Sequence, residues 1–222
     1  MPFIIALFVV FIIVSIVMGG IAAKRRREAL GALAVRLGLR FSPEKDYGMD
    51  DRYRFLDALR QGSNHYAFNI LSGNYEGYEI LVFDYHYETH STDSKGRRQT
   101  HHHYFSFFIL TLEISCPELT ITKEGFMSKI AQSLGFDDID FESHEFSRRF
   151  CVRSKDKKFA YDVCNGKMID HLLGNRDLSI EIEGSAMALS FNRRLDAPQI
   201  EYNLSRLLEI RQLMPEYLFA NK

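Results

Sequence analysis

The sequence predicts an α+β protein in which an N-terminal transmembrane helix is followed by one antiparallel-sheet domain with packed helices. Three observations support this fold class. Residues 3–23 form an uncharged, strongly apolar run. Three later segments, rich in aromatic and β-branched residues, follow one another across short turns, as antiparallel neighbours do. Apolar stripes at helical spacing lie on both sides of these segments.

The apolar run over residues 3–23 contains no Asp, Glu, Lys or Arg and has no polar face. As an α-helix it would be about 31 Å long, which matches a hydrocarbon core of about 30 Å. A cleaved signal peptide is the alternative, but basic residues would then precede the run, and here they follow it. The run is therefore expected to be a retained membrane anchor.

Four basic residues, Lys24, Arg25, Arg26 and Arg27, follow the run directly. Positive charge beside a span stays on the cytoplasmic side, which predicts a single-pass protein of the cell (inner) membrane with a cytoplasmic C-terminal domain. Residues 1–27 are then the anchor with its basic flank, and residues 28–222 the cytoplasmic α+β domain. The four side chains either set topology alone or also bind anionic lipid headgroups.

Small residues recur at every fourth position near the end of the run: Ser15, Gly19 and Ala23. Such a stripe lets two helix backbones approach closely. It makes a homodimer through this face a possible arrangement.

The first half of residues 28–222 predicts a helix over 25–38 that ends at Gly38, a short helix over 55–59, and three strands. The strands are expected over 65–71, 78–89 and 102–114. Turns at Gly73–Gly77 and Asp93–Arg97 would join them in antiparallel order. A parallel, doubly wound sheet would instead need helices between its strands.

The second half predicts further elements of both kinds. The expected helices are 123–134, 157–164, 165–173 and a final one that begins near Pro198. The expected strands are 140–144, 149–153 and a hairpin of 178–183 with 186–191 that turns at Gly184-Ser185.

A run of aromatic and charged residues links two of these elements: Glu145, Phe146, Phe150, Val152, Asp156, Phe159 and Ala160. It resembles the E-F-x-x-x-F-x-V…D…A run of a family of bacterial membrane-anchored proteins of unknown function. The resemblance implies membrane attachment and supplies no catalytic residue. Taken alone, the aromatic side chains of the run are expected to pack in the core.

Charge and motif content restrict the function. The 28 Lys and Arg nearly balance the 29 Asp and Glu, so no global basic field is available to hold nucleic acid. The chain contains no GxSxG, HExxH, GxxxxGK[ST] or GxGxxG motif, which lowers the expectation of an enzyme without removing it.

One cluster has the composition of a metal site. If the second hairpin turns at Lys95-Gly96, strand alternation brings five side chains to one face: His86, Glu88, His90, His101 and His103. Neutral imidazoles with a carboxylate suit Zn²⁺ or another transition metal. A shift of one residue in pairing would send His101 and His103 to the opposite face, and the hairpin would then be a solvated loop.

Two functional classes remain open. The favoured one is a membrane-tethered, non-catalytic interaction or binding module, held in the membrane through residues 3–23. It would present its sheet or its His-rich hairpin to a protein partner or to the membrane surface. The alternative is a metal-binding sensor or metal-dependent enzyme built on residues 86–103. The metal content of the purified fragment 28–222 separates the two.

Overall fold

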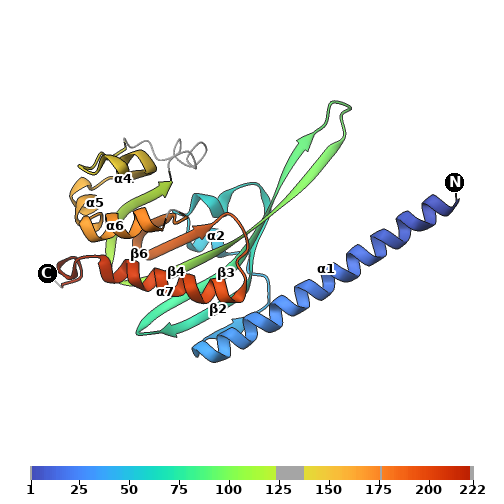
Figure 1. The fold of residues 1–222 in the computed structure, drawn as a ribbon, viewed down its shortest axis with the longest axis horizontal. Helices are drawn as coiled ribbons and strands as arrows, with labels where there is room; N and C mark the ends of the chain where they lie inside the picture. The colour runs from blue at the N-terminus through green and yellow to red at the C-terminus, as the bar shows by residue number, and fades with distance from the viewer. Residues whose placement is uncertain (1, 124–137, 176, 221–222) are drawn as a thin grey trace.

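The computed structural model describes residues 2–123, 138–175 and 177–220. The helix predicted over 123–134 falls almost entirely outside these residues. The described chain is an α+β structure around one six-stranded antiparallel sheet, as the turn spacing predicted (Figure 1). Its strands are β1 (Arg40–Ser42), β2 (Ser63–Tyr75), β3 (Tyr78–Thr92), β4 (Arg98–Lys123), β5 (Phe150–Ser154) and β6 (Ile180–Phe191).

Strand β4 organises the sheet because it is long enough to pair with three other strands. Its first part pairs with β3, its last part pairs with β5, and β6 runs along its other edge. Strands β1 and β2 extend the sheet beyond β3. The turn between β2 and β3 is made by Glu76 and Gly77, both at positive φ, as a two-residue hairpin turn requires.

Both faces of the central sheet are buried, because apolar side chains alternate between them. Phe108 and Leu110 of β4 belong to the larger core, whereas Phe107 and Ile109 belong to the smaller one. The larger core is closed by α1 (Pro2–Leu37), α5 (Lys157–Val163), α6 (Gly166–Gly174) and α7 (Ala197–Leu213). The smaller core is closed by α2 (Met49–Arg52) and the 3-10 helix η1 (Asp57–Arg60).

Two short elements complete the described fold. Helix α4 (His144–Arg149) precedes β5, and the 3-10 helix η2 (Glu216–Leu218) follows α7. The predicted strand over 140–144 is wrong, because the Ser143 hydroxyl accepts a hydrogen bond from the Phe146 amide and begins α4 there. The predicted hairpin at Gly184-Ser185 is also wrong. Gly184 has φ +58 and makes an irregularity in pairing, but β6 continues through it along β4.

Helix α1 corrects the N-terminal prediction. Within the described part of the chain, no helix is both long enough and apolar enough to cross a membrane. The predicted transmembrane helix over 3–23 is therefore wrong, and so is the single-pass placement in a cell membrane with a cytoplasmic domain. The sequence interpretation grouped the basic residues with the apolar run, as residues 1–27. In the structure, one helix runs through the basic residues to Leu37 and packs on the domain through Leu30, Leu33 and Ala34.

Candidate metal centre on the β3–β4 hairpin

The β3–β4 hairpin projects from the sheet, and its loop decides which side chains share a face (Figure 1). Two hydrogen bonds join Asp93 and Arg97 across the loop. The Asp93 amide donates to the Arg97 carbonyl at 3.0 Å, and the Arg97 amide donates to Asp93 Oδ1 at 2.9 Å. Three residues therefore lie between them, and Gly96 among these takes φ +77. This is a three-residue hairpin loop with glycine at its left-handed position.

A three-residue loop shifts the pairing by one residue from the predicted two-residue turn. Glu88 pairs with His102, not with His103, and His90 pairs with Thr100, not with His101. Since side chains alternate along a strand, the shift moves His101 and His103 to the face opposite His86. The predicted five-residue site therefore does not form.

On that opposite face the two histidines contact hydroxyl groups of β3. His103 Nε2 lies 2.8 Å from Thr89 Oγ1, and His101 Nε2 lies 2.8 Å from Ser91 Oγ. The His103 ring also stacks on Tyr87, with 4.5 Å between ring centroids. These contacts keep both imidazoles away from Glu88.

On the face of the hairpin that carries His86, the side chains of His86, Glu88 and His102 form a cluster that could hold a metal ion. One ligand atom from each lies within 4.8 Å of the others. His86 Nε2 lies 3.0 Å from His102 Nδ1, and Glu88 Oε1 lies 3.5 Å from His102 Nδ1 and 4.0 Å from His86 Nε2. The third predicted residue on this face, His90, contacts Ser63 and Thr100 instead.

Asn64 of β2 holds two of these groups. Its carbonyl oxygen lies 3.1 Å from His86 Nδ1, and its side-chain amide donates to Glu88 Oε1 at 2.7 Å. A carbonyl only accepts hydrogen bonds, so His86 carries its proton on Nδ1 and turns the lone pair of Nε2 towards His102. Asn64 reaches both groups because its backbone adopts φ +49, in an irregular part of the β2–β3 pairing. Asparagine tolerates that conformation better than most residues.

Burial and hydrogen bonding set the charge states at the cluster. His86 is only 2% exposed and lies between the rings of Tyr66 and Tyr104, at centroid distances of 4.6 and 4.8 Å. This burial lowers the pKa of His86, which favours the neutral imidazole. The hydrogen bond from Asn64 lowers the pKa of Glu88, which favours the carboxylate. A metal ion needs both ligands in these deprotonated states.

The spacing also suits coordination. Ligands at about 2.0–2.1 Å from a tetrahedral Zn²⁺ lie about 3.3 Å apart, so the observed 3.0, 3.5 and 4.0 Å require only small side-chain shifts. Two imidazoles and one carboxylate form a donor set that transition metals accept. Three protein ligands would leave a further coordination position open.

The sequence interpretation missed Asn64 and assigned the wrong histidines of β4. The Gly62-Ser63-Asn64 stretch carries a signal for irregular backbone, because Gly62 also takes a positive φ. The choice of His102 over His101 and His103 depended on the loop length alone.

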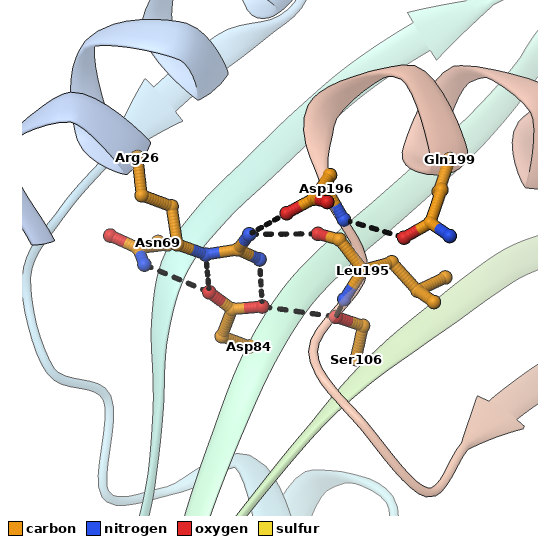
Figure 2. A network of polar contacts seen from close by, with 7 residues as sticks. All are labelled: Arg26, Asn69, Asp84, Ser106, Leu195, Asp196 and Gln199. Carbon is orange, nitrogen blue, oxygen red and sulfur yellow. Dashed lines mark hydrogen bonds and ion pairs between the residues drawn. The ribbon is translucent and has the colours of Figure 1, made fainter. Parts of the chain in front are cut away.

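The four basic residues after position 23 divide into two groups. Arg26 is half-buried and turned towards the sheet, whereas Lys24, Arg25 and Arg27 are exposed. Arg26 donates to both oxygens of the Asp84 carboxylate at 2.9 and 2.7 Å and to the Leu195 carbonyl at 2.8 Å (Figure 2). Arg26 is thus engaged within the domain, and headgroup binding by the other three stays a prediction.

The Asp84 carboxylate at the centre of Figure 2 is satisfied from three directions. Besides Arg26, it accepts from Asn69 Nδ2 at 2.9 Å and from Ser106 Oγ at 3.0 Å. The same Ser106 oxygen accepts from the Leu195 amide at 3.1 Å, which joins the start of α7 to the network. The network fixes α1, β3, β4 and the start of α7 relative to one another.

Of the small-residue stripe, Gly19 and Ala23 lie exposed on α1, and nothing in the described chain lies within 4 Å of a side chain added at Gly19. Self-association through Ser15, Gly19 and Ala23 stays a prediction.

Comparison with known proteins gives a fold likeness. No family model and no curated protein matches the chain, so the resemblance of residues 145–160 to a membrane-anchored family also stays a prediction. Among solved structures, the crystal structure of the mycobacterial trehalose monomycolate transport factor A, TtfA, matches with a TM-score of 0.61 and 11% sequence identity. The match covers 87% of this chain and 96% of the TtfA chain. At this identity, the likeness establishes a shared fold.

Proposed function

We propose that this chain is a non-catalytic binding module that takes up one divalent transition-metal ion at His86, Glu88 and His102. The observation that carries the proposal is the convergence of three ligand atoms within 4.8 Å of one another. Two hydrogen bonds of Asn64 support it: its carbonyl accepts from His86 and its amide donates to Glu88, which holds both groups in the orientation and protonation state that a metal needs.

Zn²⁺ is the metal that this donor set suits best, because it accepts imidazole and carboxylate in a flexible four-coordinate arrangement. Cu²⁺ and Ni²⁺ also bind imidazole, but they favour square-planar or tetragonal geometry. The open coordination position would be available to water or to a donor from a protein partner. The fold is shared with a protein described as a transport factor, which supports an accessory role over a catalytic one.

Matched histidine variants of the full chain test the proposal. We expect the chain, after dialysis against Zn²⁺, to retain about one ion per chain, and His102→Ala to retain far less because one ligand is lost. His103→Ala is the control, since it removes the same side chain one position away on the opposite face. Metal is measured by atomic emission, and the fold of each variant by circular dichroism.

Two results would contradict the metal site. One is equal zinc retention by His102→Ala and the unsubstituted chain. The other is an equal loss in His103→Ala, which would assign retention to surface histidines in general.

A further inference from the structure

A second site, separate from the metal cluster, lies where the end of β6 meets the first half of α7. A cavity of about 540 Å³ opens there. The end of β6 and the first half of α7 make two of its walls, and residues 177–179 make a third. Its volume falls in the range of small-molecule pockets. Its polar wall consists of Ser179, Ser190, Asn192, Gln199, Asn203 and Arg206.

Helix α7 contributes a polar stripe to the cavity. Gln199, Asn203 and Arg206 follow one another at helical spacing, beside an apolar stripe that packs in the larger core. Asn203 is 4% exposed and Arg206 is 5% exposed. Burying polar side chains costs free energy unless they are hydrogen-bonded, so a buried polar stripe beside a cavity is unusual for a purely structural helix.

Hydrogen bonds within the wall hold these side chains in place. Arg206 Nη1 donates to Asn203 Oδ1 at 2.8 Å, and Asn203 Nδ2 donates to the Gln199 carbonyl at 2.7 Å. Arg206 also donates to both oxygens of Asp177, at 3.0 and 2.5 Å. This contact lowers the pKa of Asp177, so the carboxylate and the guanidinium neutralise each other. The wall is therefore preorganised before any ligand enters.

Two further cations at the cavity lie outside this bidentate ion pair, although Arg193 also contributes to the lowered pKa of Asp177. Lys123 and Arg193 both line it and are both exposed. Within the described residues, neither has a carboxylate at ion-pair distance; the ion pair of this wall is that of Arg206 with Asp177. The cavity therefore has a positive opening above a polar, hydrogen-bonding wall. Tyr202 and the edge of Phe191 add apolar surface to it.

We propose that this cavity binds a small organic anion through Lys123 and Arg193, with a phosphate or carboxylate group at the opening. The hydroxyl and amide groups of Ser190, Asn192 and Gln199 would face the body of the ligand, and the apolar residues would accept a ring or short chain. Arg193 presents donors that fit both oxyanions. This site goes beyond the proposed metal function, because it shares no residue with the metal cluster.

Calorimetric titration of the full chain tests the site, after passage over a chelating resin so that the metal cluster plays no part. The probes are phenyl phosphate and benzoate, with benzyl alcohol as the uncharged probe of the same ring. We expect saturable binding of at least one anion and none of the alcohol. Whichever anion binds with the lower Kd identifies the group, phosphate or carboxylate, that the opening prefers.

Neighbouring arginines provide the matched variants. Arg193→Gln should weaken anion binding about tenfold, the usual effect of losing one charge-assisted hydrogen bond. Arg194→Gln removes the same charge one residue away, outside this cavity, where Arg194 lies over the Tyr104 ring. It should change affinity less than about twofold.

The proposal would be overturned by the absence of saturable binding for both anions, or by equal weakening in the two variants. Equal binding of benzyl alcohol would also overturn it, because the charge at the opening would then be irrelevant. None of these results depends on whether the hairpin binds a metal.

Discussion

Arg26 and Asp84 form a bidentate ion pair that joins helix α1 to the central sheet, with donor–acceptor distances of 2.9 and 2.7 Å. The Asp84 side chain is 1% exposed and that of Arg26 is 14% exposed. A carboxylate buried this deeply in a sheet requires a cation or several donors, and the chain supplies both. Arg26 therefore contributes to the fold of the domain as well as to the charge that follows the apolar run.

Replacing Arg26 with Met should destabilise the domain strongly, because Asp84 would remain buried without its cation. The expected loss in the free energy of unfolding is about 3 kcal/mol, measured by urea unfolding. Arg27→Met is the matched control: Arg27 is exposed, and its loss should cost less than about 0.5 kcal/mol. Equal costs for the two variants would show that the Asp84 contact contributes nothing. Adding Asp84→Asn to Arg26→Met should recover part of the loss, since the unpaired charge is then removed.

Asn64 should control metal affinity without contacting the metal. Asn64→Gly keeps a residue that accepts φ +49 but removes the amide that donates to Glu88. Loss of such a partner typically weakens metal binding by about tenfold or more, which zinc titration would measure. Asn74→Gly, at the far end of β2, removes an asparagine that accepts from the Gly77 amide. It should leave zinc affinity unchanged, and a loss equal to that of Asn64→Gly would argue against positioning by Asn64.

Glu181 of β6 should make stability depend on pH in a defined direction. Burial raises its pKa to about 8, whereas an unfolded glutamate titrates near 4.5. Between these values the unfolded chain releases a proton that the folded chain keeps, so the contribution of Glu181 to stability falls as pH rises through this window.

Glu181→Gln removes that titration. Its free energy of unfolding, relative to the unsubstituted chain, should rise by several kcal/mol, at about 1.4 kcal/mol per pH unit, from about pH 4.5 to pH 8 and then level off. Urea unfolding at a series of pH values measures the difference. Glu183→Gln, at an exposed position two residues along β6, is the control and should give a smaller change. A Glu181→Gln difference that stays constant with pH would contradict the assignment.

Gly96 should stabilise the hairpin loop that sets the register. Its φ of +77 is unfavourable for any residue with a Cβ atom, so Gly96→Ala should cost about 1 kcal/mol in unfolding experiments. It should also weaken zinc binding, because a loosened loop no longer holds Glu88 opposite His102. Gly174→Ala is the control, since a Cβ atom would meet nothing within 4 Å at either glycine and Gly174 does not take a positive φ. The stability of Gly174→Ala should be unchanged or higher. A loss equal to that of Gly96→Ala would show that the positive φ of Gly96 is not the cause.

The local patterns of the sequence predicted the three strands of the first half and helices α5, α6 and α7 correctly. The alternation over 65–114 and the turn at Gly77 specify neighbouring antiparallel strands, because both signals act over a few residues. The Asn165 cap similarly predicts helix α6, since its side chain accepts from the Lys167 and Met168 amides close by. Such features need no information from the rest of the chain.

Only the tertiary structure decided the relations between distant residues. A loop of three residues, not two, selected His102 over His101 and His103, because one residue of register exchanges the faces of a strand. The partner of Arg26 lies 58 positions along the chain, and the residue that orients His86 and Glu88 lies on a third strand. The sequence alone shows which segments carry the histidines, a carboxylate and the basic residues. Which of them meet depended on strand pairing and on helix α1 packing against the sheet, because contacts between distant segments exist only once the chain has folded.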